Sequence, residues 1–183
     1  MLVAVDRARS RGATAAVRLR PPGGDDEAAF RAAHRTMAAE AFPFGLFYEP
    51  DTPWPAYLDQ LEACRRGVDL PPGRVRSAFM LAVVAGEIVG RASIRFELND
   101  FLAHEGGHIG YCVLPPHRRR GYATVILRRS LAIARAGRVE RVLVTCDDAN
   151  VGSATVIERC GAVFESLAEP AGGGGPFRRY WIG

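Results

Sequence analysis

The spacing of hydrophobic residues changes several times along the chain, and each change predicts a different kind of element. Between positions 121 and 136, apolar residues recur three and four positions apart, which is typical of a helix with one buried face. Two strand-like runs, 77–84 and 88–98, flank the short turn at Ala85, Gly86 and Glu87 and predict a β-hairpin. Further strands are predicted over 17–20, 108–114, 141–146, 162–167 and 177–181, and further helices over 25–40, 56–66 and 151–160. This mixture indicates an α/β protein.

An irregular stretch interrupts the pattern at residues 42–55. It holds five aromatic side chains among four prolines, and the aromatic residues are Phe42, Phe44, Phe47, Tyr48 and Trp54. Because proline interrupts regular structure, we expect a loop folded over the body of the protein. Such a loop could form the wall of a pocket or a hydrophobic cluster that binds nothing, and the sequence leaves both open.

Length and composition set the domain organisation. The chain has 183 residues, of which 48% are hydrophobic and 24% charged. At about 100 to 200 residues per domain we predict a single domain over residues 16–183, preceded by a loose leader at 1–15 that lacks any sustained period. No apolar run approaches the roughly 20 residues that span a bilayer, and the start of the chain is too short in apolar residues for a signal peptide. We therefore expect a cytoplasmic protein without a membrane partner.

Arginine dominates the charge. The formal net charge is +4, and the sequence contains no lysine, so all 24 basic side chains are arginines. Three of them, Arg118, Arg119 and Arg120, stand directly before Gly121 and the predicted helix. The first N–H groups of a helix lack partners, the helix dipole is positive there, and glycine lets a ligand approach the backbone. The segment is predicted to bind an anion such as a pyrophosphate; the alternative is a solvated basic turn.

The same segment fits a longer pattern. Residues 118–123 read as Arg, two residues, Gly, one residue, Ala, just after a predicted strand that ends at Leu114. A second strand follows the helix, and Asn150 then precedes a short helix that leads into Gly161. In this combination the sequence resembles the Gcn5-related N-acetyltransferases (GNAT). The resemblance extends over residues 17–182 in element order.

The most specific part of the resemblance is residues 108–164. The sequence is most similar there to a group of uncharacterised predicted acetyltransferases, which share the segments 106–111 before the loop and 145–147 after it. The resemblance implies a GNAT-like mixed, mostly antiparallel sheet of six to seven strands, flanked by helices and splayed between the fourth and fifth strands. It implies acetyl-CoA as co-substrate and no metal. The partner would be an amine-bearing acceptor, either a small molecule or a protein N-terminus, and a homodimer stays open.

The resemblance also implies which residues hold the cofactor. The backbone of the fourth strand would pair with the pantetheine arm, and the N–H groups of the loop would hold the pyrophosphate. Asn150 would bond to the pantetheine region, a role compatible with capping the helix that follows it. The implied cofactor-binding residues are Cys112, Val113, Leu114, Arg118, Arg119, Arg120, Gly121, Tyr122, Ala123, Thr124, Asn150 and Ser153.

The chemistry of acetyl transfer calls for further groups. A protonated amine must lose a proton before it attacks the thioester, and the leaving thiolate, with an ordinary pKa of about 8.5, benefits from an acid. Many family members supply this acid from a Tyr seven residues after the Asn, where this chain has Ile157. The acid is then Tyr111, Ser153, water or nothing. For the base we consider His108 and Glu97, which flank the predicted cleft.

The sequence also contains features typical of metal sites. Residues 104–108 match the H-E-x-x-H motif of zinc proteases, but that motif works only where both imidazoles share one face of a helix. Two adjacent glycines disfavour a helix there, and no third ligand follows. The cysteines, Cys64, Cys112, Cys146 and Cys160, are far apart and form no C-x-x-C pair, so we expect reduced thiols. No metal site is predicted.

Two other functions compete with acetyl transfer. The arginines around the loop suggest nucleic-acid binding, but 20 acidic residues offset them and no interleaved aromatic residues or known module accompanies them. We therefore expect no specific nucleic-acid partner. The other competitor is a sensor of the same fold that binds acyl-CoA without turnover, an alternative that Ile157 keeps open.

Overall fold

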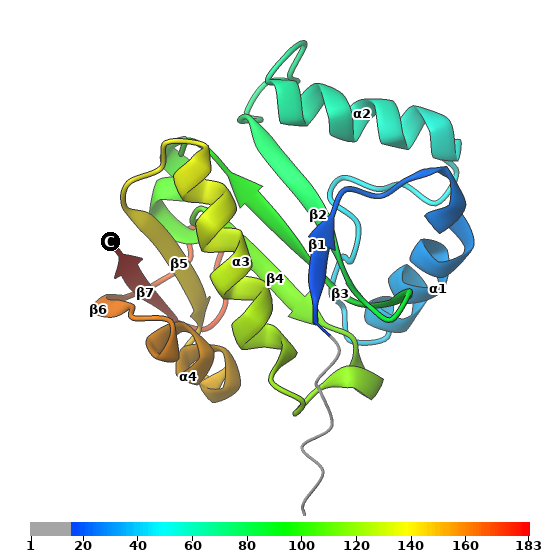
Figure 1. Cartoon of the computed structure of the whole chain (residues 1–183). Helices are drawn as coiled ribbons and strands as arrows, with labels where there is room; N and C mark the ends of the chain where they lie inside the picture. The colour runs from blue at the N-terminus through cyan, green and yellow to red at the C-terminus, as the bar shows by residue number, and fades with distance from the viewer. Residues whose placement is uncertain (1–15) are drawn as a thin grey trace, which may run out of the picture.

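Two antiparallel sheets form the centre of the structure, a computed structural model that describes residues 16–183 (Figure 1). The predicted leader at 1–15 lies outside the described residues. The first sheet has the order β1-β2-β3-β4, and the second has the order β5-β7-β6. The seven strands are β1 (Arg18–Arg20), β2 (Ser77–Val84), β3 (Glu87–Arg95), β4 (Ile109–Val113), β5 (Val142–Asp147), β6 (Val163–Ala168) and β7 (Phe177–Ile182). The expected strand number and the α/β class are confirmed.

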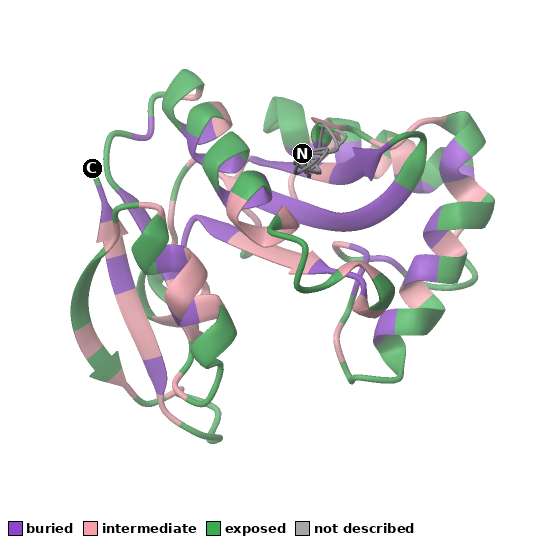
Figure 2. Cartoon of the chain, turned by 60° about the horizontal axis from the view of Figure 1, so that its bottom comes forward, coloured by how far each residue is buried: buried purple, intermediate pink, exposed green. Residues whose placement is uncertain are grey.

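The hairpin of β2 and β3 is the longest pairing in the first sheet, running from Ser77 opposite Arg95 to Val84 opposite Glu87. Its turn places Ala85 and Gly86 at φ values of 50° and 87°. Two central residues in the left-handed region match the twist of the flanking strands, which is why short hairpins favour this turn. Most of both strands is buried, as the purple ribbon in Figure 2 shows. The predicted hairpin is confirmed.

The two sheets separate between β4 and β5, where the splay was expected. Neither strand shares a ladder with the other, and β4 is paired only with β3 among the described strands. The sheets are joined at one end by His108. The backbone N–H of His108 donates to the Leu143 carbonyl at 2.8 Å, and the ring nitrogen Nδ1 of His108 accepts from the backbone N–H of Leu143 at 2.9 Å. Among the described residues, no backbone hydrogen bond joins β4 itself to β5.

The helices cover both faces of the first sheet. Helices α1 (Glu27–Ala38) and α2 (Trp54–Arg66) pack on one face, whereas α3 (Tyr122–Ala136) packs on the other, in front of β3 and β4 in Figure 1. The short helix α4 (Val151–Arg159) lies beside α3 and the second sheet. Within residues 16–183, no helix has both the length and the apolar character that crossing a membrane requires.

The aromatic loop at 42–55 is largely a hydrophobic cluster. Phe30 of α1 lies at its centre, with ring centroids of Phe44, Tyr48 and Trp54 between 5.0 and 5.5 Å away. Phe42, at the start of the loop, instead lines two cavities. Phe44, Tyr48 and Trp54 therefore belong to a hydrophobic cluster, whereas Phe42 forms part of a pocket wall, so the stretch contains both of the expected structures.

Three short helical turns were not predicted from the sequence: two 3-10 turns at Gly24–Asp26 and Pro115–His117, and one further turn. Residues Leu102–Gly106 form a single turn of π-helix, although adjacent glycines were expected to prevent a helix there. Asn99 starts the turn, because its side-chain oxygen accepts from the Leu102 N–H at 2.9 Å. Gly107, with φ of 62°, ends it one residue before His108. The two histidines of the H-E-x-x-H motif therefore do not share a helix.

Candidate functional site

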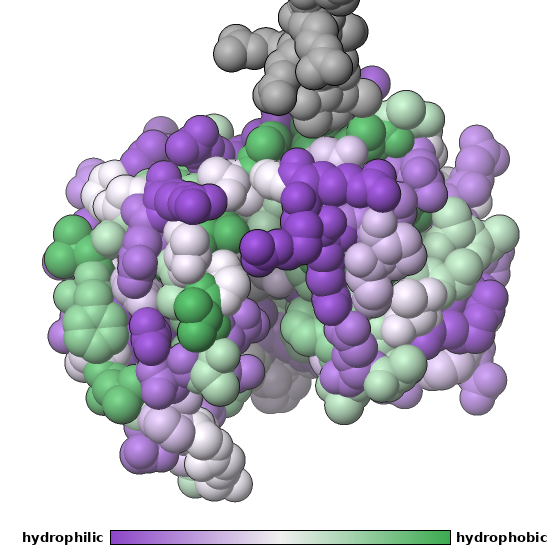
Figure 3. Space-filling view, turned by 90° about the horizontal axis from the view of Figure 1, so that it is seen from below, coloured by the Kyte–Doolittle hydropathy of each residue, from purple (hydrophilic) through white to green (hydrophobic). Residues whose placement is uncertain are grey.

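A groove of about 880 Å³ runs across the splayed end of the sheets. Its walls come from the end of α1 with Phe42, from β4, from the loop that precedes α3, and from the first turns of α4. Seen from below, the molecule is hollowed between two lobes on this face, with strongly hydrophilic side chains at the rim (Figure 3). The volume lies in the upper part of the range usual for small-molecule sites.

The loop before α3 presents its backbone N–H groups. Arg119 and Gly121 both have positive φ, at 63° and 80°, with Arg120 between them. An alternation of this kind makes a concave arrangement of N–H groups that binds anions. Within residues 16–183, no backbone N–H from Arg119 to Thr124 has an acceptor in the protein. A β-carbon placed on Gly121 would meet no atom within 4 Å, so this residue leaves the approach open.

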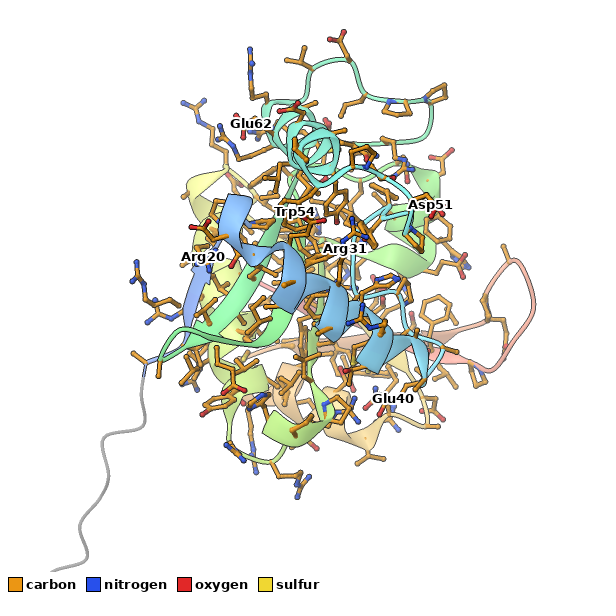
Figure 4. All side chains as sticks on the ribbon, turned by 90° about the vertical axis from the view of Figure 1, so that its right-hand side faces the viewer. Arg20, Arg31, Glu40, Asp51, Trp54 and Glu62 are labelled. Carbon is orange, nitrogen blue, oxygen red and sulfur yellow. The ribbon has the colours of Figure 1, made fainter. Side chains whose placement is uncertain are left out.

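The arginines of the loop have three different placements. Arg119 lines the groove, and Arg120 is exposed outside it. Arg118 lines the groove but is already engaged: its Nε donates to the Val113 carbonyl at 3.1 Å, and its two terminal nitrogens bond to the Glu40 carboxylate at 2.9 and 2.5 Å. Arg118 lowers the pKa of Glu40 through these bonds. Figure 4 shows Glu40 at the end of α1, so the pair ties this helix to the loop.

The strand side of the groove comes from β4. Cys112 and Val113 line it, together with Tyr122, Ala123 and Thr124 from the first turn of α3. Leu114 does not, because it is buried and its N–H donates to the Val89 carbonyl at 2.9 Å. The structure thus brings together all of the implied cofactor-binding residues except Leu114 and Arg120.

Tyr111 and the start of α4 form a hydrogen-bonded chain beside the groove. The Tyr111 hydroxyl lies 3.0 Å from the Ser153 hydroxyl, and the Asn150 side-chain oxygen accepts from the Ser153 N–H at 2.9 Å. Asn150 therefore caps α4, as one of its two suggested roles required, and the amide nitrogen of the same side chain remains for a ligand. Burial raises the pKa of Tyr111 to about 12, so its hydroxyl stays protonated at neutral pH.

A second cavity, of about 440 Å³, opens from the groove. The residues that line both are Phe42, Tyr111, Asn150 and Ser153. Beyond Tyr111 the second cavity is lined by polar side chains that the sequence analysis did not select: Arg91, Arg95, Glu105, Thr145 and Asp147. One signal was available, because Arg91 and Arg95 alternate with Ala92 and Ile94 and so mark a polar face on a buried strand.

The other selected residues lie outside both cavities. His108 is 7% exposed and uses its Nδ1 between the two sheets, and burial lowers its pKa. Glu97 accepts from the Arg76 N–H at 3.1 Å. Ile157, which occupies the position of the common Tyr, is fully buried in the core beneath α4.

The H-E-x-x-H motif at residues 104–108 does not bring its two histidines together as metal ligands. His104 contacts the Glu169 carbonyl through Nε2 at 3.0 Å, away from His108. Among residues 16–183, no three His, Cys, Asp or Glu side chains are grouped as metal ligands. All four cysteines are free thiols.

Comparison with known proteins identifies the family. The model of the acetyltransferase (GNAT) domain matches residues 16–163, and the chain belongs to this family. The resemblance drawn from the sequence motifs is thereby confirmed. Among curated proteins, the sequence has no match.

Solved structures show the same fold at low identity. RimJ of Mycobacterium smegmatis, in complex with CoA-disulfide, has a TM-score of 0.69 at 22% identity, over 92% of this chain and 83% of its own. RimL, the ribosomal L7/L12 alpha-N-protein acetyltransferase, in complex with coenzyme A, has 0.66 at 17%, over 91% and 93%. The microcin C7 self immunity acetyltransferase MccE, in complex with acetyl-CoA and AMP, has 0.63 at 16%, over 91% and 92%.

Proposed function

We propose that the protein transfers an acetyl group from acetyl-CoA to an amine. The observation that carries this proposal is the row of unpaired N–H groups from Arg119 to Thr124, at the positive end of α3 and open to the groove. Such an end of a helix suits a pyrophosphate. Family membership supports acetyl-CoA as the source of that pyrophosphate.

In this proposal the groove binds acetyl-CoA and the second cavity binds the amine. The pyrophosphate of acetyl-CoA lies on the loop, and the pantetheine arm runs along Cys112 and Val113 towards Asn150. The thioester then lies near Tyr111, where the two cavities meet, and the amine enters from the second cavity. The amine nitrogen attacks the thioester carbon, the carbon–sulfur bond breaks, and the products are the acetylated amine and CoA.

Tyr111 stabilises the leaving sulfur. With its pKa raised to about 12, its hydroxyl remains a donor throughout the neutral range. Full transfer of that proton to a thiolate of ordinary pKa about 8.5 would be uphill by roughly three and a half pKa units, or about 5 kcal/mol. Tyr111 therefore acts as a hydrogen-bond donor to the thiolate, and water supplies the final proton. Ser153, 3.0 Å away, orients the hydroxyl.

The base is drawn from the second cavity. Glu105 and Asp147 are the carboxylates that line it, so they replace His108 and Glu97 as candidates to receive the proton of the incoming amine, directly or through a water. We assign His108 the different task of holding the sheets together. We place the enzyme in the cytoplasm, where its free thiols stay reduced.

A turnover assay tests the proposal. Purified full-length protein is mixed with acetyl-CoA and a panel of amines, and release of free CoA thiol is followed together with the mass of the acetylated amine. We expect amine-dependent thiol release with an increase of one acetyl group on the acceptor. Hydrolysis without an acetylated product would contradict the proposal.

The second candidate, a sensor that binds acyl-CoA without turnover, is favoured by one observation. Ile157 is buried where relatives often carry a Tyr, so α4 lacks the acid that is common in the family. A sensor would bind acetyl-CoA and give no thiol release with any amine. The two candidates therefore differ in the assay above, because Tyr111 takes over the role of the missing Tyr only in the enzyme.

A further inference from the structure

Two arginines lie side by side beneath the second cavity without a carboxylate partner. Arg91, Ser93 and Arg95 alternate along β3 and share one face of the strand. Both arginines line the cavity, and Arg91 is only 8% exposed. Among residues 16–183, the ion pairs connect neither guanidinium to an Asp or Glu.

The protein satisfies these two charges poorly. Arg91 donates to the Ser93 hydroxyl and the Gly110 carbonyl at 3.3 Å and to the Pro43 carbonyl at 3.2 Å, and its guanidinium carbon lies 4.9 Å from the centre of the Phe42 ring. Within residues 16–183, its Nε has no acceptor. Arg95 donates to the Gly106 and Gly107 carbonyls at 3.3 and 3.4 Å. These bonds are long, and every acceptor is neutral. Burial, together with the charge of Arg91, lowers the pKa of Arg95 to about 10.

A buried charge is costly unless an opposite charge accompanies it. Here two like charges share one wall, which adds their repulsion to the cost of burial. The arrangement is expected in a site whose missing negative charge arrives with a ligand. Glu105 and Asp147 also line the cavity, but neither pairs with the arginines, so they remain free for the amine.

Gly110 keeps the pair accessible. A β-carbon at this position of β4 would lie 3.6 Å from an Nη1 atom of Arg91 and 3.6 Å from the Nη1 atom of Arg95. The two guanidinium groups thus lie close together beside Gly110, and the absence of a side chain at this position leaves them open to the cavity. An oxyanion bound in the cavity in front of Gly110 could accept from both arginines, which a single neutral oxygen does less well.

We propose that the second cavity selects acceptors that carry an oxyanion, a carboxylate or a phosphate group, which binds to Arg91 and Arg95 while the amine faces Tyr111 and the thioester. This inference rests on the proposed function, because it gives the cavity to the acceptor. The acceptor is then a small zwitterionic molecule of the amino-acid type. A cavity of about 440 Å³ holds a molecule of that size.

The test compares acceptors that differ only in charge. Amino acids are paired with their carboxamides and with the matching aminoalkyl phosphonates, and kcat and KM are measured with acetyl-CoA for each. We expect the anionic member to exceed its amide by roughly tenfold or more in kcat/KM, mainly through KM. Preference for the carboxylate or for the phosphonate identifies the oxyanion. Equal rates for acids and amides would overturn the inference and leave the acetyltransferase proposal intact.

Variants locate the effect. Arg95→Gln should reduce the ratio of acid to amide to near one, with the affinity for CoA unchanged. The control is Arg65→Gln, which removes an exposed arginine paired with Glu62 on α2 and should leave the ratio as it is. An unchanged ratio in Arg95→Gln would contradict the assignment of this residue. The comparison on the wild-type protein needs no variant, so a variant that fails to fold does not remove the test.

Failure of the proposed function gives a different result. If no amine is acetylated, binding of glutarate to the CoA-loaded protein is measured by calorimetry. Saturable binding that Arg95→Gln abolishes would support the oxyanion site in the absence of turnover. No heat with glutarate or with inorganic phosphate would overturn it.

Discussion

At the scale of single residues, Gly121 is the position where we expect a side chain to interfere with cofactor binding. Gly121 has φ of 80° and free space around its α-carbon, and it lies within the row of backbone N–H groups from Arg119 to Thr124, here called the N–H cradle. Gly121→Ala should weaken CoA binding by roughly tenfold or more, because the new methyl group occupies the approach of the phosphates. The measurement is the dissociation constant by calorimetry.

The matched control for this glycine is Gly73. It has φ of 76° and equally free surroundings, and it lines neither cavity. Gly73→Ala should carry a similar backbone strain, about 1 kcal/mol, and leave CoA affinity unchanged. Equal losses in both variants would mean that backbone strain, and not access to the cradle, limits binding.

Tyr111 is the residue that we propose as the hydrogen-bond donor to the leaving sulfur. Tyr111→Phe should lower kcat on the order of 10- to 100-fold, since one donor to the leaving sulfur is lost. The dissociation constant for CoA should change little. Because the pKa of Tyr111 is raised to about 12, the wild-type rate should show no loss from its ionisation below pH 10. A variant with full activity would remove Tyr111 from the mechanism.

At the scale of elements, a partly buried ion pair fixes the start of α1. Both terminal nitrogens of Arg20 on β1 donate to the Asp26 carboxylate, at 2.5 and 2.7 Å, and the Gly23 N–H donates to the same group at 2.7 Å. Asp26→Asn should lower the free energy of unfolding by about 1 to 3 kcal/mol at pH 7, measured with urea.

The acid dependence of that pair has a defined sign. Arg20 lowers the pKa of Asp26 in the folded state, so the carboxylate stabilises the fold at pH values above its unfolded pKa of about 4. The contribution is lost as the pH falls through the lower folded value. The difference between Asp26→Asn and wild type should therefore shrink at pH 3, and a constant difference would contradict this origin.

The elements also show what hydrophobic spacing can predict. The strand runs and the amphipathic helix α3 were found within a few residues, because their side chains repeat with the period of one buried face. The helix over 56–66 begins two residues earlier, at Trp54, since Pro55 fits the first turn of a helix. The π-turn at Leu102–Gly106 was missed because it depends on the Asn99 cap and not on a period.

The sequence predicted the part of the site that is contiguous in the chain, and it did not predict the parts that depend on contacts between distant residues. The cradle followed from a local motif, since Gly121 and its neighbours are contiguous in sequence. The placement of Arg91 and Arg95 in the second cavity could not be predicted in the same way, because it requires knowing which face of β3 turns towards the splay. The contact of His108 with Leu143 could not be predicted for a related reason: it joins residues distant in the chain.

At the scale of the whole molecule, His108 holds the two sheets together and so keeps the splay in shape. His108→Phe leaves the Leu143 N–H without an acceptor and should lower the free energy of unfolding by about 1 to 3 kcal/mol at pH 7.5. Because burial lowers the pKa of His108, the neutral form stabilises the fold above the unfolded pKa of about 6.5. This contribution is lost as the pH falls through the folded value.

The same variant separates a positioning role from a basic one. If His108 only joins the sheets, the pH profile of kcat/KM in His108→Phe keeps the shape of the wild-type profile. Loss of the ascending limb of that profile, with unchanged stability, would instead make His108 the base. Urea titrations at pH 7.5 and 5.5 measure the free energy of unfolding of the wild type and of His108→Phe for this comparison.

The central claim is that the backbone cradle before α3 holds the pyrophosphate of acetyl-CoA. The most direct measurement is calorimetry of the full-length protein with acetyl-CoA and with S-acetylpantetheine, which carries the same thioester without the nucleotide and its phosphates. We predict saturable binding of acetyl-CoA and an affinity for S-acetylpantetheine weaker by roughly a hundredfold. No binding of acetyl-CoA, or equal affinity for the two compounds, would contradict the account.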